Sequence, residues 1–165
     1  MLKEIKPDSI AFLMPCGGAV EPRVVQSAIN LVTSAQIQGY TIRQVGITDR
    51  TLVHTARNIL AQGFLATDCE WAFWMDSDME VPPDALIRLL KHNKDIVGAT
   101  YNKRTPRDDG TYETLGRLVD NETSDLRSGV HEAALLPGGM LLVKADVYRK
   151  MPKPWYATCY LWPGE

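Results

Sequence analysis

Short apolar runs alternate with amphipathic segments over the first hundred residues, and this alternation constrains the fold more than any other feature. Residues 10–14 (IAFLM) end at Pro15, Gly17 and Gly18, as a buried strand followed by a loop would. Further strands are predicted at residues 40–47, 71–75 and 95–100. Helices are predicted between them, at residues 23–38, 52–66 and 84–92.

The spacing of apolar residues gives two of these helices a predicted buried face. In the first helix the face is Val25, Ala28, Ile29, Val32 and Ala35. In the second it is Leu52, Ala56, Ile59, Leu60, Gly63 and Phe64. The order of elements predicts an α/β fold with a mostly parallel central sheet and helices on both faces.

The second part of the chain is less regular, and a single domain of residues 1–165 is expected from the length. Residues 103–125 are polar with short β-like pieces, and the apolar run 135–143 is interrupted by Pro137, Gly138 and Gly139. A short helix is predicted at residues 145–151, followed by an aromatic segment at 156–162.

Composition excludes several classes of protein. The net charge is −2, from 18 Lys and Arg against 20 Asp and Glu, which does not suit a nucleic-acid backbone. The basic cluster at residues 103–107 is followed at once by two aspartates. No apolar run reaches the roughly 20 residues of a transmembrane segment, and no signal peptide is evident. The three cysteines are far apart, which favours a reducing, cytoplasmic location over a disulfide framework.

The end of the third predicted strand is the most informative position, since ligands of open α/β sheets bind beyond the carboxyl ends of strands. There an apolar strand leads directly into Asp76 and Asp78. On an extended chain these two carboxylates project to the same side and can reach one hard divalent cation. The alternative is that they only begin a turn before Pro82 and Pro83.

Three other features remain open between a binding role and a structural one. Arg57 could extend from its helix to a phosphate, although periodicity alone favours a solvated helix face. Gly138 and Gly139 would allow a close approach to a ligand or would only form a tight turn. The late aromatics could stack on sugar rings or, more commonly, pack against the sheet; they are Trp155, Tyr156, Tyr160 and Trp162.

Taken together, several segments resemble the GT-A glycosyltransferases, in particular the family 2-like branch with short bacterial and phage members. They are Ala-Arg-Asn at 56–58, the strand entering Asp76-Ser77-Asp78, Val-Pro-Pro at 81–83, the run from Asp95 to Arg104, and Gly138 to Val143. The resemblance implies a GT-A-like sandwich, with residues 1–104 as the nucleotide-binding half and 105–165 as an acceptor-side half that is expected to be incomplete.

The resemblance also implies a nucleotide-sugar donor and an acceptor that is a glycan, lipid or protein. Asp76 and Asp78 would hold Mn²⁺ or Mg²⁺ on the donor diphosphate, with Ser77 between them. Pro15, Asp49 and Arg57 would line the nucleotide pocket, and Gly138 and Gly139 would lie near the donor sugar or the acceptor. The expected function is metal-dependent transfer of a sugar.

One departure from the family pattern concerns the catalytic base. Inverting members usually carry a carboxylate beyond an aromatic loop, and here Glu165 is the candidate, as the last residue. The chain is therefore expected to be a truncated or minimal catalytic domain, and a second copy could cover its incomplete part. Two other functions stay open: a nucleotidyltransferase of related fold, and a non-catalytic nucleotide-sugar-binding domain.

Overall fold

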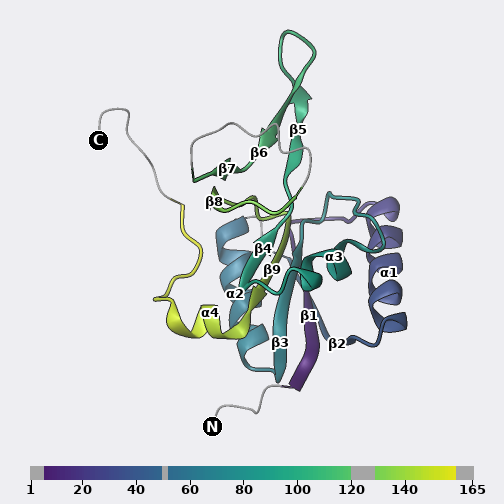
Figure 1. The fold of residues 1–165 in the computed structure, drawn as a ribbon, viewed down its shortest axis with the longest axis vertical. Coiled ribbons are helices and arrows are strands. Elements are labelled where there is room, and N and C mark those ends of the chain that lie inside the picture. Colours follow the sequence, from purple (N-terminus) through teal and green to yellow (C-terminus); the bar gives the residue numbers. More distant parts are fainter. Residues whose placement is uncertain (1–5, 50–51, 120–128, 159–165) are drawn as a thin grey trace.

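A computed structural model describes residues 6–49, 52–119 and 129–158 of the chain (Figure 1). The central sheet consists of β1 (Lys6–Cys16), β2 (Thr41–Asp49), β3 (Cys69–Met75), β4 (Ile96–Gly98) and β9 (Met140–Lys144). The helices are α1 (Pro22–Ile37), α2 (Val53–Leu65), α3 (Ala85–Lys91) and α4 (Ala145–Lys150). The remaining strands are β5 (Tyr101–Pro106), β6 (Tyr112–Leu115), β7 (Arg117–Leu118) and β8 (Ala133–Leu135). The predicted α/β class is confirmed.

The central sheet is mixed, and this corrects the expected mostly parallel arrangement. Its strand order is β2-β1-β3-β9-β4. β1 pairs in parallel with β2 and β3, whereas β9 runs antiparallel between β3 and β4. β3 and β4 therefore never pair with each other, because a strand from the last third of the chain separates them. A run of apolar residues reveals burial but not strand direction, so the sequence could not indicate this insertion.

Helices cover both faces of the sheet, as predicted, and each face has its own core. The α1 and α3 side packs against Ile10, Phe12, Trp71, Phe73 and Leu142. The α2 and α4 side packs against Ala11, Leu13, Ala72, Trp74 and Leu141. This alternation along β1 and β3 follows from the two-residue period of a strand. The two cores hold the carboxyl end of β3 from both sides.

The buried faces of α1 and α2 differ in part from the predicted ones. In α1 the buried residues are Val24, Ser27, Leu31 and Ala35, while Val25 and Ile29 are exposed. In α2, Ala56, Leu60 and Phe64 are buried as predicted, but Leu52 and Ile59 are exposed. Apolar residues surround more of both helices than one stripe, so periodicity alone placed the stripe too far to one side.

The β5–β6 hairpin projects away from the sheet and its helices (Figure 1). Along β5 only Tyr101 is partly buried, and the other five residues are exposed. The short strands β7 and β8 form a separate antiparallel pair. Among residues 6–49, 52–119 and 129–158, no helix has the length and apolar character needed to cross a membrane.

Candidate functional site

The carboxyl ends of β1, β2 and β3 bring several predicted residues to one edge of the sheet. Cys16 pairs with Asp49 at the ends of β1 and β2. Leu13 pairs with Trp74 in the β1–β3 ladder, and Pro15 and Asp76 each follow by two residues. Because β9 is antiparallel, its beginning lies at this same edge. Gly139 precedes it, and its carbonyl accepts a hydrogen bond of 3.1 Å from the Asp76 amide.

Arg57 lies beneath this edge and is paired with Asp76. Its Nη2 is 2.6 Å from Asp76 Oδ1 and donates to the Gly138 carbonyl at 3.0 Å. The guanidinium lies over the rings of Trp74 and Tyr156, at 5.2 and 5.7 Å from their centroids. Only 7% of Arg57 is exposed, so the solvated helix face favoured by periodicity is wrong. An ion pair and two aromatic rings offset the cost of burying this charge.

Asp76 and Asp78 lie in a turn, not on extended chain. The Met79 amide donates to the Asp76 carbonyl at 3.2 Å, which makes these residues a β-turn. The expectation of two carboxylates on extended chain is thus corrected, because the strand ends at Met75. Burial raises the pKa of Asp76 above its ordinary value; Arg57 opposes this shift, and the charge of Asp78 adds to it. Both carboxylates therefore belong to one turn at the end of β3.

The second aspartate has an arginine partner of its own, from the projecting hairpin. Arg104 Nη2 is 3.2 Å from Asp78 Oδ2 and also donates to the Asp78 backbone carbonyl. Both side chains are well exposed, 69% for Arg104 and 59% for Asp78. The site thus holds two acid–arginine pairs, one beneath the edge of the sheet and one in solvent.

Gly138 and Gly139 are required by the packing around them. A Cβ at Gly138 would lie 2.9 Å from the Arg57 guanidinium carbon, and a Cβ at Gly139 would overlap Met79 Sδ and the Tyr101 hydroxyl. The Gly139 amide donates to that hydroxyl at 3.0 Å. The sequence analysis considered a close approach to a ligand or a tight turn for this glycine pair. Neither interpretation included contacts with the protein's own side chains.

Asn58 and Tyr156 lie on the protein side of Arg57, and the sequence analysis did not predict that either would support this arginine. Asn58 Nδ2 donates to the Tyr156 carbonyl at 2.7 Å, and Asn58 Oδ1 accepts from the Trp155 amide at 3.0 Å. These bonds hold the segment after α4 against α2. Tyr156 packs against Trp74 of β3, as the alternative of packing on the sheet predicted, whereas Trp155 packs against Tyr148 of α4. The adjacent Arg57-Asn58 pair was the available signal.

The acid pair can be tested for its fit to a divalent cation. Within residues 6–49, 52–119 and 129–158, no group of three or more His, Cys, Asp or Glu side chains is arranged to hold a metal ion. Mg²⁺, however, is commonly held by only one or two carboxylates together with waters and substrate phosphates. Asp76 and Asp78 fit that donor set. Ser77 lies between them, half-buried.

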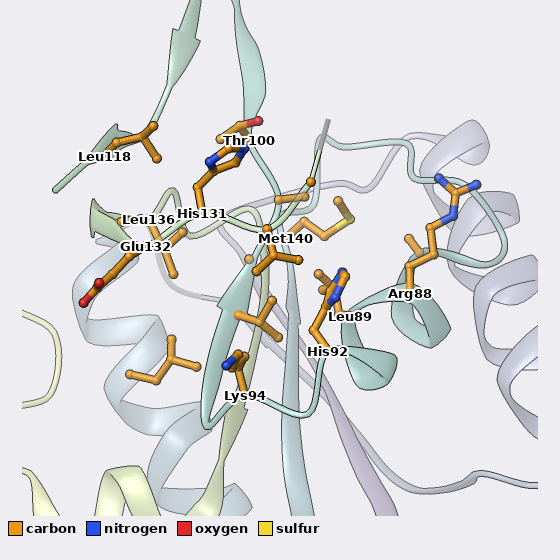
Figure 2. Close-up of a pocket in the computed structure, with 18 of the residues that line it drawn as sticks. Arg88, Leu89, His92, Lys94, Thr100, Leu118, His131, Glu132, Leu136 and Met140 are labelled. Atoms are coloured by element: carbon orange, nitrogen blue, oxygen red, sulfur yellow. The ribbon is translucent and has the colours of Figure 1, made fainter. Parts of the chain in front are cut away.

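A cavity of about 810 Å³ lies beside the edge strand β4, between α3 and residues 129–136 (Figure 2). Its walls are largely apolar, with Leu89 and Leu136 among them, and it also carries His92, Lys94 and His131. None of the predicted site residues lines it. Its lining does include Met140, which directly follows the glycine pair.

One comparison with known proteins bears on this geometry. A model of the Anp1 family, which comprises mannosyltransferase-type glycosyltransferases, matches residues 41–121. The chain is similar to that family there. The match runs from the start of β2 to beyond β7 and includes Arg57, Asp76, Asp78 and Arg104. It supports glycosyltransferase activity in general and does not single out the family 2-like branch. No curated protein sequence matches the chain.

The predicted site residues thus fall into four groups. Asp78, with Ser77 before it, lies in the turn after β3 and pairs with Arg104. Arg57, Asp76, Gly138 and Gly139 are joined by direct contacts. Pro15 and Asp49 lie at the same edge of the sheet, at the ends of β1 and β2. Glu165, the candidate base, lies outside the described residues, as do Tyr160 and Trp162.

Proposed function

We propose that this protein is a glycosyltransferase that takes a sugar from a nucleotide-sugar donor with the help of Mn²⁺ or Mg²⁺. The supporting observation is that the segment similar to the Anp1 family carries two neighbouring carboxylates at the carboxyl end of a buried strand. This is where an open α/β sheet binds ligands, and the residues there fit a cation shared with phosphates.

The roles of the residues follow from their contacts. Asp76 and Asp78 would hold the cation, which would supply positive charge to offset the negative charge that develops on the departing nucleoside diphosphate. Arg57 fixes the orientation of Asp76 through its bond to Oδ1. Tyr101 and Arg57 hold the turn at Gly138 and Gly139 next to the first aspartate. The GT-A assignment of the fold belongs to the same proposal.

The test is a thermal-shift panel of nucleotide sugars and nucleoside diphosphates, with and without Mn²⁺. At a ligand concentration of about 100 Kd, binding adds about 2.7 kcal/mol, which corresponds to a rise in Tm of roughly 5–10 °C for a domain of this size. We expect this rise only when both the correct nucleotide and the cation are present.

Two variants and one control make the test specific. Asp76→Asn and Asp78→Asn should abolish the cation-dependent rise. Asp146→Asn should retain it, since Asp146 carries the same side chain on α4 and pairs with Arg149 at 2.9 Å. A shift that persists in both site variants, or that needs no cation, would contradict the metal assignment. The same panel ranks the donors by base and sugar.

A further inference from the structure

The two arginines of the site differ in whether they can leave their aspartates. Arg57 lies over the rings of Trp74 and Tyr156 and donates a hydrogen bond to the Gly138 carbonyl. Any movement of its guanidinium therefore breaks several contacts at once. Arg104 is 69% exposed, and the two contacts described for it, an ion pair and a hydrogen bond, are both with Asp78. An exposed ion pair contributes about 0–1 kcal/mol, so this second pair is easily exchanged.

We propose that Arg104 is an exchangeable counter-ion of Asp78. The cation displaces Arg104 from Asp78, and the released Arg104 then binds the phosphates of the donor. This inference rests on the proposed function. It gives the β5–β6 hairpin a role, because Arg104 comes from β5 and pairs directly with Asp78.

Charge and geometry support the exchange. A divalent cation interacts with Asp78 more strongly than a single guanidinium does at the same distance, so it competes successfully for that carboxylate. The released guanidinium then lies next to the cation, where the donor phosphates arrive. Its planar fork of donors matches phosphate oxygens better than an ammonium group would. The site thereby exchanges an arginine–carboxylate pair for an arginine–phosphate pair.

The exchange predicts effects of opposite sign on two ligands. In Arg104→Ala, Mn²⁺ alone should bind more tightly, by up to about fivefold, because it no longer competes with the arginine for Asp78. At saturating Mn²⁺, the same variant should bind nucleoside diphosphate about tenfold or more weakly, since it has lost a charge-assisted hydrogen bond. Arg104→Lys keeps the charge without the fork and should recover only part of the nucleotide affinity.

The chain offers a matched control on the neighbouring residue. Lys103 lies on the same strand, and its Nζ is 2.7 Å from Glu113 Oε2 on β6, so it faces away from Asp78. Lys103→Ala changes the net charge of the hairpin by the same amount as Arg104→Ala. It should leave both affinities unchanged within about twofold, because exposed charges at this range are largely screened.

The experiment measures Mn²⁺ binding by electron paramagnetic resonance and nucleoside diphosphate binding by calorimetry. The diphosphates of the four common nucleosides are compared first, and the best is used with every variant. Opposite changes in Arg104→Ala, absent in Lys103→Ala, support the exchange. Unchanged affinities in Arg104→Ala, weaker binding of Mn²⁺, or equal effects in both variants would overturn it. If the wild-type protein binds no diphosphate with Mn²⁺, the proposed function itself fails, and the exchange with it.

Discussion

The central sheet and the β5–β6 hairpin meet at the candidate site, but they are built in opposite ways. In β3 every residue except Glu70 is buried, because helices pack on both faces and strands on both edges. In β5 every residue except Tyr101 is exposed, because its only partner strand is β6. The first region holds Asp76 firmly in place, and the second brings Arg104 to Asp78 on an exposed arm. One acid is therefore positioned by packing and the other by a solvent-exposed contact.

The largest expected effect distinguishes the two regions by their contribution to stability. Phe73→Ala removes a ring that is fully buried in β3, and it should lower the free energy of unfolding by about 3–5 kcal/mol. Tyr112→Ala removes a ring of β6 that is 53% exposed, and it should cost about 0.5 kcal/mol. Urea denaturation measures both. Similar losses would mean that the hairpin packs more tightly than its exposure indicates.

A second comparison uses the two arginines. Arg57→Ala should destabilise the protein by about 3 kcal/mol, the lower end of the range for breaking a buried pair, because Asp76 is itself 31% exposed. Arg104→Ala should cost under about 1 kcal/mol. Denaturation midpoints at low and at high salt measure this difference, and only the Arg104 variant should converge on the wild type as salt screens its pair. Equal losses of stability in the two variants would contradict the distinction between a buried and an exposed ion pair.

The smallest expected effect is in the pH dependence of stability. One aspartate from each region contributes to it, and the two contributions should change with pH in opposite directions. Burial raises the pKa of Asp76 above its ordinary 3.8, so the folded state binds its proton more readily than the unfolded state does. The stability from this group is complete below pH 3.8 and is lost as the pH rises through the folded pKa.

Asp109, in the hairpin loop, shows the reverse. Hydrogen bonds from the side chain and backbone of Thr111 lower the pKa of Asp109 below 3.8. Its contribution is present above that value and is lost as the pH falls through the folded pKa. Subtracting the stability profiles of Asp76→Asn and Asp109→Asn from that of the wild type, between pH 2.5 and 6, isolates each group. Differences of the same sign would contradict the assigned environments.

The first hundred residues were predictable because their signals are local. The helices and strands described in that part were located from apolar runs, amphipathic spacing and the Pro and Gly residues between them. Asp76 was identified as a candidate site residue because ligands of open α/β sheets bind beyond the carboxyl ends of strands. The bounds shifted by a few residues. The buried face of α1 was displaced because Val25 and Ile29 are apolar yet exposed.

The site was less predictable because its contacts join distant segments. The pair of Arg57 and Asp76 spans 19 residues, and the bond from Arg57 to Gly138 spans 81. No periodicity encodes such distances. A lone arginine on a helix is ordinarily predicted to face solvent. Only the folded structure shows that a carboxylate and two aromatic rings lie next to Arg57.

The antiparallel insertion of β9 has a consequence for the order in which the protein is made. When β3 and β4 have left the ribosome, the strand that separates them has not yet been synthesised, so each has a bare edge facing the other. Open edges of this kind attract strands of other chains. The glycine turn beside Asp76 arrives with the same late strand. A nascent chain halted before residue 138 should therefore aggregate readily and lack the glycine turn of the candidate site.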